Sequence, residues 1–212
     1  MGTPQTLTLP AASSPEANAA LTEMLRALQD ALRVAPQAAP TPALPREARE
    51  ALARALVAHD AYVAVVRAST PMSCAAGCVA CCHDNPRGVS GGEIDLLAAA
   101  VAALPDGAAV FAAFAASARD PLPADAHRAA RRPCPLLRGG LCALYAARPV
   151  ACRAFHAITP AAFCDPAHPS YADRMNPHLD PPAVLVQALR VLAARHGLPP
   201  SIDLHAGMAA YA

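Results

Sequence analysis

Cysteines are the residues of this chain best suited to carry chemistry, and four of its eight cysteines fall within nine residues. Thiols at this density form disulfides, ligate a metal or serve as a redox centre. Neighbouring Cys81 and Cys82 argue against a disulfide framework, because a bond between adjacent residues strains the backbone. We predict all eight as metal ligands: Cys74, Cys78, Cys81, Cys82, Cys134, Cys142, Cys152 and Cys164.

The spacing of the first group favours chelation. Cys78 and Cys81, two residues apart, let two sulfurs face one ion, and thiolates bind zinc tetrahedrally or hold iron–sulfur clusters. Gly77 permits the tight turn before them, and Cys74 adds a third ligand. Adjacent side chains diverge, so Cys82 indicates two metals, a polynuclear cluster, or one ligand beside a spare thiol.

The second group is too widely spaced to chelate locally, so Cys134, Cys142 and Cys152 must converge through the fold or be buried core cysteines. Arg148 and Arg153 either offset thiolate charge and donate hydrogen bonds to sulfur or lie exposed on the surface. Three histidines near cysteines are candidate substitute ligands, with His156 the best placed; they are His83, His156 and His168.

The composition indicates one domain of closely packed helices. The 212 residues are 55% hydrophobic, largely through alanine, with 4% aromatic residues and no tryptophan. All 17 basic residues are arginine, a bias typical of GC-rich coding and therefore of a bacterial source.

Charge and hydropathy exclude two classes of partner. The net charge is +1, and no concentrated basic face of the kind that binds nucleic acid is visible. No run approaches the ~20 apolar residues of a membrane span, and residues 1–15 lack the features of a secretory signal. We expect a cytoplasmic protein, whose reduced thiols favour metal binding or catalysis over four disulfides.

Helical periodicity supplies the predicted elements. Ser14 and Pro15 begin a first helix with Leu21, Leu25, Leu28 and Leu32 on one face, and Pro36–Pro45 is a linker. A second helix covers about 45–68, with His59 on its apolar face as a core histidine. We divide the chain into an N-terminal segment, 1–44, and a cysteine-cluster metal-binding domain, 45–212.

Further helices are predicted after the first cysteine group. Ser90 and Glu93 form a capping box, Asp106 caps the next helix, Pro182 begins a third, and Ser201 caps a last short one. The segment 142–148 is a candidate short helix, and Gly139-Gly140 lies in a loop. With no strand pattern found, we predict an all-α fold: a small helical domain with long irregular cysteine-bearing loops organised around a metal site.

The combined motif resembles the YkgJ-type cysteine-cluster family of zinc- or iron-chelating domains. The resemblance covers residues 74–155 and rests on the first four cysteines, Val89-Ser90 with Glu93, Cys134-Pro-Leu-Leu, Cys142-x-Leu-Tyr145, Arg148-Pro149 and Cys152-Arg153-x-Phe155. It implies metal binding and leaves zinc and iron open. The cofactor expected is zinc or iron, as a mononuclear site, a dinuclear site or an iron–sulfur cluster.

Three functions follow from these observations. The first is a cytoplasmic metal-binding protein that chelates zinc or iron, with a metal ion as its partner. Because the family includes the cysteine-rich part of flagellin lysine methylases, the second is a related iron–sulfur enzyme, although no Gly-rich nucleotide loop is recognisable. The third is a handling protein for a soft ion such as copper, which thiolates select.

Overall fold

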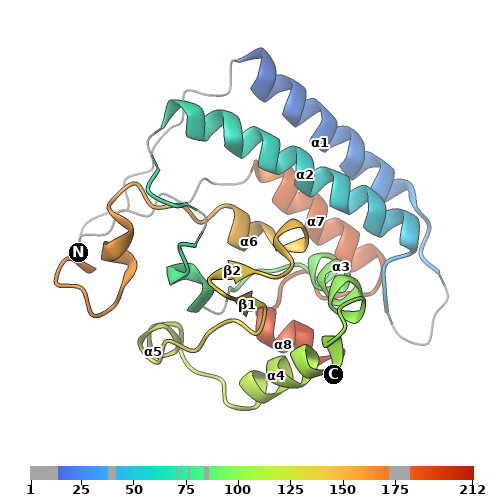
Figure 1. Cartoon of the computed structure of the whole chain (residues 1–212). Helices are drawn as coiled ribbons and strands as arrows, with labels where there is room; N and C mark the ends of the chain where they lie inside the picture. The colour runs from blue at the N-terminus through green and yellow to red at the C-terminus, as the bar shows by residue number, and fades with distance from the viewer. Residues whose placement is uncertain (1–13, 38–41, 71, 76, 84–85, 172–181) are drawn as a thin grey trace.

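The computed structural model describes residues 14–37, 42–70, 72–75, 77–83, 86–171 and 182–212 (Figure 1). Within these ranges the protein is mainly helical, with the cysteines in loops and in short elements between the long helices, which confirms the predicted fold class. The long helices are α1 (Pro15–Arg33), α2 (Arg46–Ser69), α3 (Gly91–Ala102), α4 (Gly107–Arg119) and α7 (Ala183–Arg195). The short elements are α5 (Ala124–Ala129), α6 (Val150–Arg153), α8 (Leu204–Ala209), the 3₁₀ turns η2 (Ala80–His83), η3 (Tyr145–Ala147) and η4 (Ala161–Cys164), and the strands β1 (Leu137–Arg138) and β2 (Leu141–Cys142).

Helix α1 begins as predicted, because the Ser14 side chain accepts a hydrogen bond from Ala17 N at 3.1 Å and Pro15 takes the first helical position. Its buried face differs from the predicted leucine stripe. Leu25 is 40% exposed, and α1 instead buries mostly alanines together with Met24 and Leu28. Small side chains let α1 and α2 pack closely side by side, and they run in opposite directions (Figure 1).

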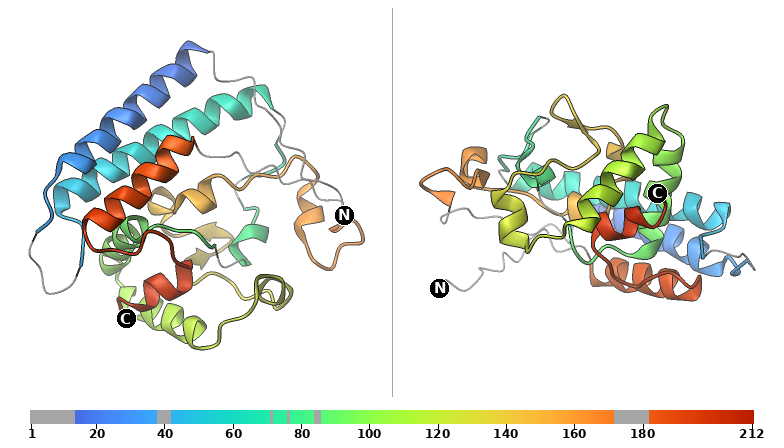
Figure 2. Two further views of the ribbon diagram at one scale, coloured as in Figure 1. Left: turned by 180° about the vertical axis from the view of Figure 1, so that it is seen from behind. Right: turned by 90° about the horizontal axis from the view of Figure 1, so that it is seen from below.

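A first core forms where α1, α2 and α7 meet (Figure 2). The predicted apolar face of α2 is confirmed, since Leu52, Leu56, Val63 and Val66 are buried. Because α1 shares this core, it packs on the rest of the chain; the boundary at residue 44 stays a prediction, and the linker positions 38–41 lie outside the described residues.

A second core joins α3, α4 and α8 and supports the cysteine-bearing hairpin, because Leu136 is part of it and Cys134 and Cys142 pack against it. The capping box that begins α3 is confirmed: Ser90 Oγ accepts from Glu93 N, and Ser90 N donates to Glu93 Oε2. No described helix is both long and apolar enough to cross a membrane.

Two predicted caps are wrong in detail. Asp106 precedes α4 but makes no capping hydrogen bond; its carboxylate pairs with Arg138 at 2.5 Å. Helix α8 begins after Asp203 rather than after Ser201, because Ile202 pairs with Val89 in an isolated β-bridge that keeps the chain extended.

A small hairpin replaces part of the predicted loop and helix between residues 137 and 148. Strands β1 and β2 pair antiparallel, with Cys142 opposite Leu137. Gly139 and Gly140, at φ +55° and +80°, form the two-residue turn with positive φ that such hairpins require. Only 145–147 are helical, as η3. The prediction of no strands was wrong here, and the Gly-Gly pair between Arg138 and Leu141 was the signal to use.

A buried histidine beneath α4 gives the first testable prediction. His205 Nδ1 lies 2.7 Å from Ser117 Oγ, and its ring packs edge-on against Phe114 and His127. Burial, and then the charge of His127, lowers the pKa of His205 to about 4. The folded state therefore favours the neutral ring, and its stabilisation is complete above about pH 6.5 and is lost as pH falls toward 4.

We expect His205→Gln to lose less stability than the wild type when both are moved from about pH 7 to pH 4.5, by on the order of 2 kcal/mol. The measurement is urea denaturation of both proteins at each pH. Taking this double difference cancels acid effects that the two proteins share, and equal losses would contradict the prediction.

Candidate metal centre

The first cysteine group lies on a tight turn that follows α2. Gly77, at φ +87°, adopts the left-handed conformation expected of a glycine there. The backbone then folds back on itself, because Cys78 N donates to Ala75 O and Cys82 N donates to Val79 O. This places Cys81 and Cys82 within the 3₁₀ turn η2.

The thiols of neighbouring Cys81 and Cys82 interact, and their hydrogen bond is the largest cause of the shifted pKa of Cys81. That hydrogen bond and burial strongly raise the pKa of Cys81, and the negative charges of Cys82, Cys152 and Cys74 raise it further. Both members of the doublet therefore interact with thiols of the second group.

The second group meets the first through the backbone and through its thiols. Cys134 N donates to Cys82 O at 2.7 Å. Burial, followed by the thiols of Cys142 and Cys82, raises the pKa of Cys134 to about 12. Burial also raises the pKa of Cys152, and the next causes are the thiols of Cys134, Cys142 and Cys82. Residues 50 or more positions apart thus gather in one electrostatic environment, as the sequence predicts.

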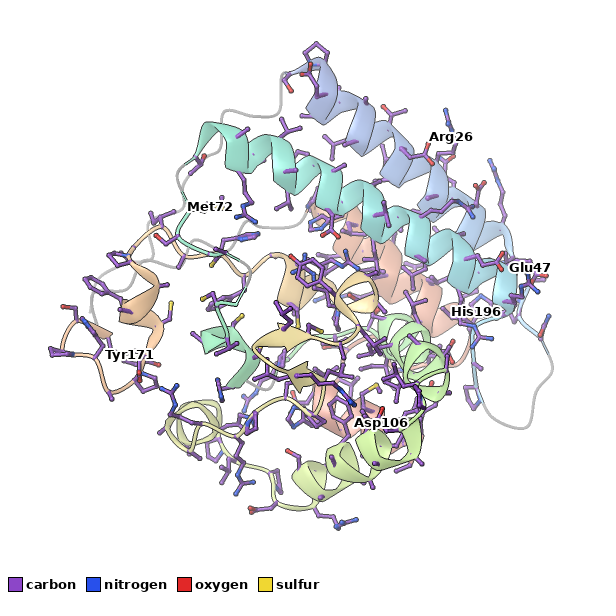
Figure 3. All side chains as sticks on the ribbon, in the orientation of Figure 1. Arg26, Glu47, Met72, Asp106, Tyr171 and His196 are labelled. Carbon is purple, nitrogen blue, oxygen red and sulfur yellow. The ribbon has the colours of Figure 1, made fainter. Side chains whose placement is uncertain are left out.

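Cys74 joins this region from the other side. Its sulfur accepts a hydrogen bond from Ala157 N at 3.1 Å, and Arg67 donates to its carbonyl oxygen at 2.7 Å. Burial is the main cause that raises the pKa of Cys74, and its thiol is also hydrogen-bonded to Cys78. Figure 3 shows several sulfur atoms on the side of the molecule where Met72 and Tyr171 are labelled.

Cys164 lies on the last of the cysteine-bearing turns. It ends η4, which packs against η2, and it lines a half-open pocket together with Cys78. None of the eight cysteines is joined in a disulfide. As the described side chains stand, no three His, Cys, Asp or Glu residues are close enough to hold an ion. The assignment of all eight cysteines as ligands therefore stays a prediction.

Arg153 holds the second cysteine group in place. It is fully buried, and its guanidinium donates to the carbonyl oxygens of Arg148, Leu56 and Ala146 and to the carboxylate of Asp60. These bonds satisfy the charge that burial would otherwise destabilise. Because Cys152 precedes it directly, Arg153 ties this cysteine to α2.

Arg148 fits the predicted role of offsetting thiolate charge better than Arg153 does. Its guanidinium lies 3.6 Å above the centre of the Tyr145 ring and 3.3 Å from Asp60 Oδ1. Burial raises the pKa values of Cys142 and Cys152, and the positive charge of Arg148 opposes this shift at both thiols. It therefore favours thiolates at the centre, although the structure shows no hydrogen bond from it to sulfur among the described residues.

Sequence reasoning missed two buried or half-buried carboxylates that position the site. Asp60 on α2 receives Arg148 and Arg153, and Glu93 Oε1 accepts from Val150 N at 2.7 Å, which anchors the start of α6. Burial raises the pKa of Glu93. The only sequence signals were a capping-box glutamate and an aspartate next to an apolar helix face.

The candidate histidines differ in their surroundings. His59 and His156 are buried, and burial lowers the pKa of each to about 4. Within the described residues, His59 Nδ1 and both ring nitrogens of His156 have no hydrogen-bond partner. His59 is thus a core residue as predicted. His83 Nδ1 contacts Val79 O at 3.1 Å, and His168 Nδ1 accepts from Ser170 N.

The chemistry of the donors fits a thiophilic metal. Thiolates are the ligands of structural zinc and of iron–sulfur clusters, and a nearby guanidinium offsets their charge. Buried thiols with raised pKa values must release protons when they ligate, so metal affinity at such a site falls as pH falls.

Comparison with known proteins agrees with this donor set. Residues 73–170 match the family model CxxCxxCC, described as "Putative zinc- or iron-chelating domain". The match confirms the resemblance to the cysteine-cluster family and supports zinc or iron binding. The searches of curated proteins and of solved structures gave no match.

Proposed function

We propose, from the match of residues 73–170 to a zinc- or iron-chelating family, that this protein binds more than one metal ion in a single thiolate centre. The ligands would come from both cysteine groups: Cys74, Cys78, Cys81, Cys82, Cys134, Cys142 and Cys152. The observation that carries the proposal is the hydrogen bond from Cys134 N to Cys82 O at 2.7 Å, which places the second cysteine group beside the Cys81-Cys82 doublet.

The number of thiols favours more than one ion. A structural zinc ion takes four ligands, whereas six thiols interact with one another around the doublet: Cys74, Cys81, Cys82, Cys134, Cys142 and Cys152. The thiols beyond these four would ligate a second ion, either as thiolates that bridge two ions or as ligands of an iron–sulfur cluster. Since no three His, Cys, Asp or Glu side chains in the described part of the chain are close enough to hold an ion as they stand, binding would require rotation of cysteine side chains.

Metal content measured on the full chain, purified without oxygen, tests the proposal. We expect at least two zinc or iron atoms per chain by elemental analysis. Visible absorption that bleaches on reduction would identify an iron–sulfur cluster, and a colourless protein would identify zinc. A single ion per chain, or none, would contradict the proposal.

A further inference from the structure

An exposed tyrosine packs on a charged side chain beside the second cysteine group. The Tyr145 ring is 57% exposed, so burial in the core does not account for its position. The guanidinium carbon of Arg148 lies 3.6 Å from the centre of this ring, and a cation at this distance is attracted to the aromatic face. Such a contact covers one face of the planar guanidinium and leaves the N–H groups around its edge able to donate.

The edge of the Arg148 guanidinium has a paired part and an unpaired part. Nη2 lies 3.3 Å from Asp60 Oδ1. Nε is buried and has no hydrogen-bond partner among the described residues. The guanidinium of Arg153 already occupies the other Asp60 oxygen and the Ala146 carbonyl. Because a buried N–H without an acceptor is costly, Arg148 Nε requires an acceptor that these groups do not supply.

The backbone places Arg148 close to Cys152. Cys152 N donates to Pro149 O at 2.9 Å, at the start of α6. Arg153 Nε donates to the Arg148 carbonyl oxygen at 2.7 Å. The residue with the unpaired N–H and the thiol of Cys152 are therefore held within about one turn of the chain.

Cys152 differs from other thiols of the centre in what opposes its raised pKa. Burial raises the pKa of Cys74, Cys134 and Cys142, and at each of them a hydrogen bond from a backbone N–H opposes this shift. Burial and then the neighbouring thiols raise the pKa of Cys152, and the charge of Arg148 opposes it. A thiolate is a stronger acceptor than a thiol, because a hydrogen bond to an ionised acceptor is charge-assisted. Ligation as a thiolate would make the Cys152 sulfur the acceptor that Arg148 Nε lacks.

We propose that Tyr145 is a positioning residue of the metal centre. Its ring, together with Asp60, holds the Arg148 guanidinium in place, and Arg148 Nε donates to the Cys152 thiolate when metal binds. This hydrogen bond draws electron density from the sulfur and stabilises the bound thiolate. Groups that orient and tune metal ligands in this way change metal affinity by about 10–100-fold. The inference rests on the proposed function and goes beyond it, because it gives an exposed residue that binds no metal an influence on the ligands.

Chelator competition and absorption spectroscopy on the metal-loaded full chain test the proposal. The band to follow is the sulfur-to-metal charge-transfer absorption, recorded with Co²⁺ in place of zinc if the purified protein is colourless. We expect Tyr145→Leu to lower metal affinity by about tenfold and to shift this band to lower energy. Tyr145→Phe keeps the aromatic face and behaves as the wild type. Val57→Ala, which removes an exposed apolar side chain of α2, is the control and changes neither measurement.

Arg148→Lys separates a hydrogen bond from a charge. Lysine keeps the positive charge but lacks the planar guanidinium and its Nε donor, so we expect the same band shift as in Tyr145→Leu. A lysine variant with the wild-type band overturns the inference, and so does a Tyr145→Leu protein with wild-type affinity and band; the proposed function stands in both cases. A wild-type protein that carries no metal contradicts the proposed function itself, and the inference with it.

Discussion

Replacement of Arg153 by methionine is expected to lower the free energy of unfolding by about 3 kcal/mol, near the lower end of the cost of removing one partner from a buried ion pair, because the Asp60 side chain is 34% exposed. The guanidinium is fully buried and serves Asp60 and three carbonyl oxygens. Methionine fills similar space but takes the guanidinium donor away from the carbonyl oxygens of Arg148 and Ala146, and it leaves Asp60 paired only with Arg148. Each buried acceptor without a donor is costly. Loss of bound metal should accompany the change, because Cys152 precedes Arg153.

Chemical denaturation of the full chain measures this effect, and Arg132→Met is the matched control. Arg132 is the more exposed arginine, and its ion pair with Asp120 lies at the surface, so its replacement should change stability by less than about 0.5 kcal/mol. An effect of Arg153→Met as small as that of the control would show that the buried guanidinium does not hold the site together.

The second large effect is expected for Cys152→Ser. Cys152 lies on α6 between two anchors, Val150 bonded to Glu93 and Arg153 bonded to Asp60. If it is a ligand, metal-binding free energy is also folding free energy. We expect loss of at least one ion per chain and a melting temperature lower by about 10 °C, which corresponds to several kcal/mol for a chain of this size.

Two controls separate ligation from packing. In excess chelator the wild type and Cys152→Ser should melt at nearly the same temperature, because serine replaces a thiol with a slightly smaller group. Cys164→Ser should keep the full ion count and melting temperature. A Cys152→Ser protein that retains all its metal would show that this thiol is not a ligand.

Local signals predicted the helices well. The side chains of Ser14 and of Ser90 with Glu93 cap the nearest backbone donors, an interaction that needs no distant partner. The second-helix face was also predictable, since apolar residues at helical spacing must be buried somewhere. The exposure of Leu25 was not predictable. Alanines and Met24 on the neighbouring face of α1 allow a closer approach to α2 than a leucine stripe would.

The site was predicted by residue type and only partly by arrangement. Motif spacing identified the cysteines, and convergence of the second group through the fold was one of two expectations for it, but the hydrogen bond between Cys134 and Cys82 was not predicted. The interaction between Cys81 and Cys82 depends on the 3₁₀ turn η2, and no residue pattern predicted this turn. Asp60 was missed because its partner, Arg153, lies 93 positions away, and an isolated aspartate on a helix carries no sign of such a partner.

The contacts of the Arg153 guanidinium also limit how far the chain can be truncated. The segment recognised by sequence similarity starts at residue 73, yet two of the four groups that bind Arg153, Asp60 and the Leu56 carbonyl, belong to α2. A fragment starting at residue 73 would keep every cysteine and lose half of the acceptors that hold one of them. The matched segment, residues 73–170, is therefore smaller than the part of the chain that holds Cys152 in place, which includes α2.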